Sequence, residues 1–244
     1  MLFSPSARIA FAHYPKTAGT SIAAWFHEAF PDATLVDPHN QHLPVRPSLE
    51  RLGEVAGLPR RPRIVREILR LCDDGLTTFG LSSLRSDIRV IGVIRDPFEM
   101  LVSLFEYWCR AGRFEDSDHP FFRAALRGAF RDFVSLAVTD CCAKTYENFF
   151  DVGGPTWPTT RLIAFDSLQD GLEEVCQEFD IAHVPRLERL NGTPRYQRTL
   201  ADYADEAGPL YDCIQRRFAW YYRRGAHLAI RGPQRDFLRL RQAA

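Results

Sequence analysis

The chain has 244 residues, of which 45% are hydrophobic and 25% charged, and its 31 basic side chains balance 31 acidic ones. This length suffices for one α/β domain with a full core, and the balanced charge excludes a general attraction to nucleic acid. No apolar run reaches the roughly eighteen residues of a transmembrane helix, and the first residues lack the pattern of a secretory signal. We therefore expect a single soluble, cytoplasmic domain over residues 1–244, with residues 231–244 as a loosely ordered tail.

The cysteines indicate a reducing compartment. They form no CxxC pair and show no Cys/His spacing typical of zinc, so we expect no metal site among them. Most lie in apolar segments with a helical pattern, where reduced thiols fill a core. The six are Cys72, Cys109, Cys141, Cys142, Cys176 and Cys213.

The segment from Ile9 to Ile22 has the layout of a phosphate cradle. The apolar run Ile9–Tyr14 predicts a strand, the small-residue stretch Lys16–Gly19 a loop, and the residues from Thr20 a helix. Backbone N–H groups and the positive end of the helix dipole would point at an anion there, and a glycine lets the backbone approach it closely. The alternative is an ordinary strand-to-helix connection with a threonine N-cap and a solvated lysine.

This loop is not a standard P-loop, because its lysine comes first and no glycine precedes it. Instead the sequence Pro15–Ser21, PKTAGTS, resembles the 5'-phosphosulfate loop of the PAPS-dependent sulfotransferases. The resemblance is to the carbohydrate branch, with its heparan-sulfate 2-O-like and bacterial members. It implies that Lys16 stabilises the charge on the bridging oxygen of the leaving phosphate. It also implies that the loop binds the cofactor through Lys16, Thr17, Ala18, Gly19, Thr20 and Ser21.

A polar loop with two histidines follows a short second strand predicted over Ala33–Val36. In the family, a histidine or glutamate just beyond the second strand commonly serves as general base. The resemblance therefore makes His39 and His42 candidates for that role, and their spacing does not choose between them. The alternative is a surface loop with solvated histidines.

A second candidate site follows the β-branched run Arg89–Ile94, which predicts a strand buried on both faces of a parallel sheet. Arg95 lies where this strand ends, and Ser103 lies on the helix that begins near Pro97; together a guanidinium and a hydroxyl can hold a phosphate. The alternative is a helix cap or an ion pair. The segment resembles the family's 3'-phosphate motif, RDPxxRxxSxY, except that Met100 replaces the second arginine.

The remainder of the chain resembles the family more faintly. Residues 161–165 predict another core strand, residues 120–139 one or two helices, and residues 206–223 the last helix. The aromatic residues between positions 114 and 150 are candidates for a wall that stacks on an acceptor. Asn191, Thr193 and Arg195 fall where a family loop wraps the nucleotide, and Arg195 is our candidate there, with solvent exposure as the alternative.

These patterns predict an α/β fold, a P-loop-like three-layer αβα sandwich with a central parallel sheet. The resemblance implies a sulfotransferase that moves the sulfuryl group of PAPS, without a metal, to a hydroxyl of a glycan, glycolipid or small glycoside, releasing PAP. A P-loop-type kinase and a catalytically inactive nucleotide-binding module are the alternatives. A bacterial cytoplasmic enzyme, or a chain without its membrane anchor, fits the sequence, which does not fix the oligomeric state.

Overall fold

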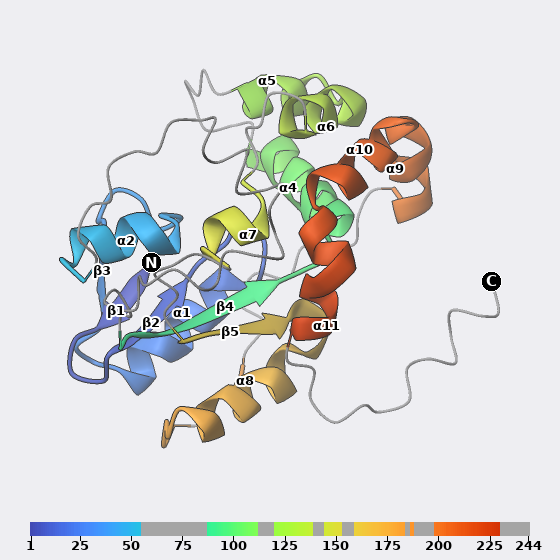
Figure 1. Cartoon of the computed structure of the whole chain (residues 1–244). Helices are drawn as coiled ribbons and strands as arrows, with labels where there is room; N and C mark the ends of the chain where they lie inside the picture. The colour runs from blue at the N-terminus through green and yellow to red at the C-terminus, as the bar shows by residue number, and fades with distance from the viewer. Residues whose placement is uncertain are drawn as a thin grey trace, which may run out of the picture.

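The structure, a computed structural model, describes residues 1–54, 87–111, 120–138, 144–152, 159–183, 186–187 and 198–229 (Figure 1). Within these ranges, five strands form one sheet in the order β3-β1-β2-β4-β5. The strands are β1 (Leu2–Ser4), β2 (Ile9–Ala12), β3 (Thr34–Leu35), β4 (Arg89–Ile94) and β5 (Thr159–Ala164). β2, β4 and β5 are parallel, whereas β1 is antiparallel to both β2 and β3.

The prediction of a central parallel sheet is therefore correct for three strands and wrong for the sheet as a whole. β1 was not predicted, and the strand predicted over Ala33–Val36 forms as β3 but is antiparallel to its neighbour β1, where a parallel sheet was expected. The physical reason is the short turn Pro5–Arg8, because a connection of this length allows only an antiparallel hairpin between β1 and β2. The described elements form an α/β fold with a mixed sheet.

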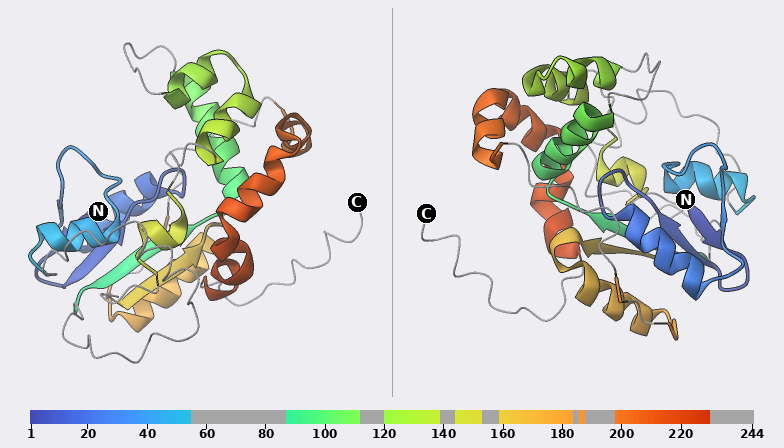
Figure 2. Two further views of the ribbon diagram at one scale, coloured as in Figure 1. Left: turned by 45° about the horizontal axis from the view of Figure 1, so that its top comes forward. Right: turned by 180° about the vertical axis from the view of Figure 1, so that it is seen from behind.

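Helices cover both faces of this sheet, as Figures 1 and 2 show for α8 (Leu168–Glu178) on one side of β4 and β5 and α7 (Tyr146–Phe149) on the other. Alternating residues of β2 divide between the two cores. Ile9 and Phe11 pack under α1 (Gly19–Ala29) and α8. Ala10 and Ala12 face α4 (Pro97–Ala111) and α7. A strand buried on both faces is typical of a parallel sheet between helical layers.

The other described helices complete the second core. They are α2 (Val45–Arg51), α5 (Pro120–Leu126), α6 (Phe130–Val138), α9 (Leu200–Ala207), α10 (Leu210–Arg217) and α11 (Ala226–Leu228), with the 3-10 turn η1 (Phe165–Ser167) and the π-helical turn η2 (Tyr221–Gly225). The helices predicted over residues 120–139 are confirmed as α5 and α6. The last helix, predicted over residues 206–223, is interrupted, because Gly208 has a φ of 53° and Pro209 starts a new helix.

The predicted aromatic wall is wrong for the part of residues 114–150 that the structure describes. Its phenylalanines and its tyrosine are buried in the core instead of facing an acceptor, namely Phe121, Phe122, Phe130, Phe133, Tyr146, Phe149 and Phe150. The predicted tail, residues 231–244, lies outside the described residues. No helix in the described ranges combines the length and the apolar character needed to cross a membrane.

Candidate functional site

The loop between β2 and α1 leaves the start of α1 open to an anion. Lys16 and Ala18 have φ angles of 63° and 59°, in the left-handed region that residues with a side chain rarely adopt. Ala18 is the N-cap and supplies no side-chain hydrogen bond. The N–H of Ile22 makes a helical bond, 3.1 Å from the carbonyl oxygen of Ala18. The three N–H groups before it, those of residues 19–21, have no carbonyl acceptor within the helix.

The alternative of a threonine N-cap is not what forms. Thr17 is fully buried, and its hydroxyl donates to the carbonyl oxygen of Tyr14 at 2.9 Å. The hydrogen bond of this hydroxyl therefore stabilises the loop internally, and a phosphate at the surface does not reach Thr17. Thr20 is exposed and Ser21 half-buried at the open start of the helix.

A side chain that sequence reasoning missed, His13, packs directly against Gly19. A Cβ added to Gly19 would lie 1.7 Å from Nε2 of His13, far inside van der Waals contact. The His13 ring also stacks on Phe11 with ring centroids 5.8 Å apart. Gly19 is therefore required by the close approach of an imidazole. The sequence did contain a pattern that points to His13. Alternate residues of a strand share one face, so His13 lies on the same side as Ile9 and Phe11, the side that α1 covers.

Lys16 lies in a cluster of positive charge. Its ammonium is 4.4 Å from the ring centroid of Tyr107 on α4, a cation–π contact. Burial lowers the pKa of Lys16, and repulsion from Arg110 and Arg95 lowers it further. Tyr107 and Arg110 were not predicted. The signal that would have found them is their spacing of four and seven residues from Ser103, which puts all three on one face of α4.

Arg95 is held at the end of β4 by its neighbours on three sides. Its guanidinium lies 3.3 Å from a Glu99 carboxylate oxygen and 4.4 Å from the ring centroid of Phe165, which follows β5. The Tyr146 hydroxyl donates to the backbone oxygen of Arg95 at 2.7 Å and accepts from its N–H at 3.2 Å. The Arg95 side chain is 13% exposed. Its position is therefore fixed at the carboxyl edge of the sheet.

The alternative function considered for the Arg95 segment, a helix cap, is performed by Asp96. Asp96 accepts hydrogen bonds from the N–H groups of Phe98 and Glu99, at 2.9 and 3.1 Å, and so caps α4.

Ser103, 2% exposed, lies further along α4, and no described residue hydrogen-bonds to its hydroxyl. Met100, where the family motif has an arginine, is 1% exposed and belongs to the core. Met100, where this sequence departs from the motif, therefore occupies a core position in this protein.

The structure brings His42, and not His39, to the loop. Nδ1 of His42 lies 3.0 Å from the carbonyl oxygen of His13, and the two imidazole rings meet edge to face at 4.5 Å. Because a carbonyl oxygen only accepts, Nδ1 carries the proton, and the lone pair on Nε2 of the neutral ring accepts from the Gln41 amide at 3.4 Å. Burial lowers the pKa of His42, which keeps the ring neutral. His39 is exposed, and its backbone N–H donates to Asp37.

The other residues that the sequence singled out add nothing to the description of this site. Asn191, Thr193 and Arg195 lie outside the described residues, as do Cys72, Cys141 and Cys142. Of the described thiols, all free, Cys176 fills the core as expected, whereas Cys109 is exposed. No group of three or more His, Cys, Asp or Glu side chains in the described ranges is arranged to hold a metal ion.

Comparisons of the chain with protein-family models, curated proteins and solved structures found no match.

Proposed function

We propose that this protein is a PAPS-dependent sulfotransferase with a P-loop-like αβα architecture, which transfers the sulfuryl group to a hydroxyl acceptor and releases PAP. One observation carries the proposal. β2 and β4 are parallel neighbours, so the loop after β2 and Arg95 after β4 lie at the same edge of the sheet. There the ammonium of Lys16 is close enough to Arg95 and Arg110 for repulsion to lower its pKa. Lys16 and the two arginines, which pair with Glu99 and Glu106, beside a helix start without a side-chain cap suit a ligand with several anionic groups.

The chain's own groups divide naturally between two phosphates. The free N–H groups of Gly19, Thr20 and Ser21 would hold the 5'-phosphate at the positive end of α1. Arg95 would hold the 3'-phosphate, the group that distinguishes PAPS from other adenine nucleotides. Ser103, 2% exposed, would contact that phosphate only if its hydroxyl became accessible. PAPS supplies the sulfuryl group, attached to its 5'-phosphate. The start of α1 and the guanidinium of Arg95 suit the two phosphates of this donor.

A phosphate bound at Arg95 would replace a carboxylate partner. The guanidinium lies 3.3 Å from a carboxylate oxygen of Glu99. A phosphate can accept two charge-assisted hydrogen bonds from a guanidinium, as a carboxylate does. The stacking on Phe165 keeps the guanidinium plane at the sheet edge while its partner changes.

In the reaction, Lys16 would stabilise the negative charge that develops on the bridging oxygen of the leaving phosphate, and the start of α1 would add to it. Its lowered pKa comes from burial and like charge, so an anion beside it relieves an unfavourable arrangement. His42 would accept the proton of the acceptor hydroxyl at Nε2, which its contact with the His13 carbonyl leaves unprotonated. Lys16 and the helix terminus supply the positive charge, so the proposal requires no metal ion.

Calorimetric titration of PAP tests this proposal, with adenosine 5'-phosphosulfate and ATP–Mg²⁺ as comparison ligands. We expect PAP to bind most tightly and Arg95→Ala to weaken it by at least tenfold. The matched control is Arg46→Ala, which removes an arginine from a similar pair on α2, 3.2 Å from Glu50. If ATP–Mg²⁺ binds better than PAP, or if both substitutions act alike, the protein is not a sulfotransferase of this design. PAP binding without turnover of PAPS would indicate an inactive nucleotide-binding module.

A further inference from the structure

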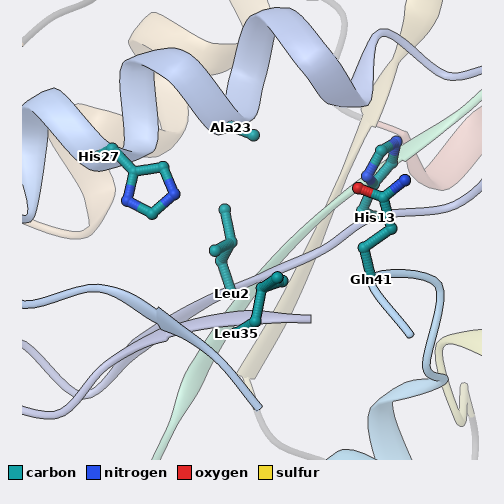
Figure 3. A pocket seen from close by; sticks show the side chains of 6 residues that line it. All are labelled: Leu2, His13, Ala23, His27, Leu35 and Gln41. Atoms are coloured by element: carbon teal, nitrogen blue, oxygen red, sulfur yellow. The ribbon is translucent and has the colours of Figure 1, made fainter. Parts of the chain in front are cut away.

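A small pocket lies beside the loop, on the side of the sheet that α1 covers (Figure 3). Its volume is about 110 Å³, and it is lined by Leu2, His13, Ala23, His27, Leu35 and Gln41. In Figure 3, Ala23 and His27 come from α1 and face Leu2 and Leu35 across the pocket, whereas His13 and Gln41 lie together at its other end. The pocket is thus distinct from the cationic cluster around Lys16.

The lining is suited to a neutral ligand that carries hydroxyl groups. It contains no carboxylate, ammonium or guanidinium, only imidazoles and an amide that donate and accept hydrogen bonds, with aliphatic carbons between them. Burial, together with nearby positive charge, lowers the pKa of His13 to about 3, so this ring is neutral near pH 7. Such a lining holds no lysine, arginine or acidic side chain to bind an ion, and too many polar atoms for a hydrocarbon chain.

The size of the pocket limits the ligand to a fragment. Its 110 Å³ is smaller than an engineered cavity of about 150 Å³ that holds benzene, and well below the roughly 300 Å³ of the smallest common ligand pockets. A hydroxymethyl arm or part of a sugar ring fits this volume. The rest of a larger acceptor would remain outside.

The polar end of the pocket adjoins the proposed base. The Gln41 amide donates to Nε2 of His42 at 3.4 Å, so an acceptor hydroxyl would reach this atom by displacing the amide. His13 lines the pocket, packs on Gly19 and accepts from His42 through its carbonyl oxygen. A hydroxyl held beside Gln41 therefore lies between the base and the loop.

We propose that this pocket is the acceptor subsite and takes a neutral, hydroxyl-bearing fragment, with the reacting hydroxyl turned toward His42. The assignment rests on the proposed sulfotransferase function. As the acceptor oxygen bonds to sulfur, His42 takes the hydroxyl proton at Nε2. The bond from sulfur to the bridging oxygen breaks, and its electron pair leaves with the phosphate of PAP.

Titration of the whole protein with methyl β-glucopyranoside, followed by NMR of the histidine ring protons, tests the subsite. Sodium sulfate and 1-butanol serve as the anionic and the apolar probe. We expect the glycoside to shift the His13 and His27 signals. Ala23→Leu, which fills the pocket, weakens binding at least tenfold, as does Gln41→Ala at an exposed position. Ala24→Leu, one residue further along α1 and outside the lining, leaves it unchanged.

Three results would overturn the subsite: no shift with the glycoside, equal binding of the glycoside to Ala23→Leu and Ala24→Leu, or a shift of the His27 signals at lower concentrations of sulfate or butanol than of the glycoside. Titration of PAP into the same variants shows whether the acceptor subsite alone is wrong or whether the proposed sulfotransferase function is wrong as well. We expect PAP to bind the wild type and Ala23→Leu equally. If PAP does not bind the wild type, the sulfotransferase proposal fails and the acceptor assignment fails with it, whatever the glycoside does.

Discussion

Replacing Gly19 by alanine tests whether His13 determines the geometry of the loop. The new Cβ would lie 1.7 Å from Nε2, 1.8 Å from Cδ2 and 2.4 Å from Cε1 of His13, whereas real Cβ contacts are essentially never shorter than 3.0 Å. Phe11 and His42 flank the ring, with ring centroids 5.8 and 4.5 Å away, so the ring can retreat only toward the pocket that it lines. Either the ring or the first turn of α1 must move.

The expected cost follows from two opposing effects. Inserting a methyl group into a packed site typically destabilises a protein by about 1–3 kcal/mol. Alanine in place of glycine in a helix returns up to about 1 kcal/mol, and less at the first turn. We therefore expect Gly19→Ala to lower the free energy of unfolding by about 1–2 kcal/mol, measured by urea denaturation, and to weaken PAP binding because the loop is displaced.

The double variant with His13→Ala identifies the cause. Without the ring, the alanine Cβ at position 19 fits, so the substitution is neutral or stabilising in that background. A double-mutant cycle in urea should give a coupling energy of about 1–3 kcal/mol between Gly19 and His13. A coupling energy near zero would refute the reasoning, because Gly19→Ala would then cost the same whether or not the imidazole is present.

Three further predictions concern charge at the site and in the core. Lys16→Met should raise the melting temperature of the nucleotide-free protein while abolishing turnover of PAPS, because it removes a half-buried charge that Arg95 and Arg110 repel. The pKa of His13 is about 3 when folded, against an ordinary 6.5, so its neutral ring contributes fully to stability above pH 6.5. That contribution is lost as pH falls toward 3, at about 1.4 kcal/mol per pH unit, or about 2 kcal/mol at pH 5. In urea denaturation at a series of pH values, the free energy of unfolding of His13→Gln should therefore decrease less between pH 6.5 and pH 3 than that of the wild type. Met100→Arg should destabilise the protein by more than about 3 kcal/mol in the same assay without tightening PAP binding, since its position is in the core and not at the ligand.

Sequence patterns predicted the local parts of the candidate site well. The loop after Ile9–Ala12 and the helix after it form where the small residues and the apolar periodicity place them. The strand Arg89–Ile94 forms over its β-branched run, and Arg95 follows it directly. These features depend on residues that are neighbours in the chain, so a short window of sequence contains the information that specifies them.

The parts that escaped prediction depend on contacts between distant segments. The pairing of β3 with β1 depends on a hairpin at the start of the chain, and periodicity alone carries no information on strand order. Tyr107 becomes part of the site only because α4 packs beside the loop that carries Lys16. His39 and His42 could not be separated by spacing, because what distinguishes them is the contact of His42 with the carbonyl oxygen of His13.

The features of this site that cost stability all occur together. Two residues with side chains adopt left-handed backbone conformations, a helix begins without a side-chain cap, and three cations approach one another. Each is unfavourable in the protein alone. Left-handed residues (Arg8, Asp151 and Asp180) and helices without a side-chain cap (α2, α7, α8 and α10) also occur elsewhere in the described chain, so what sets this loop apart is their combination with like charges that repel Lys16. Local arrangements that conflict with stability persist where function retains them. An anion at the start of α1 would hydrogen-bond to the free N–H groups and offset the positive charge at the same time. One bound anion thus accounts for two of these costs.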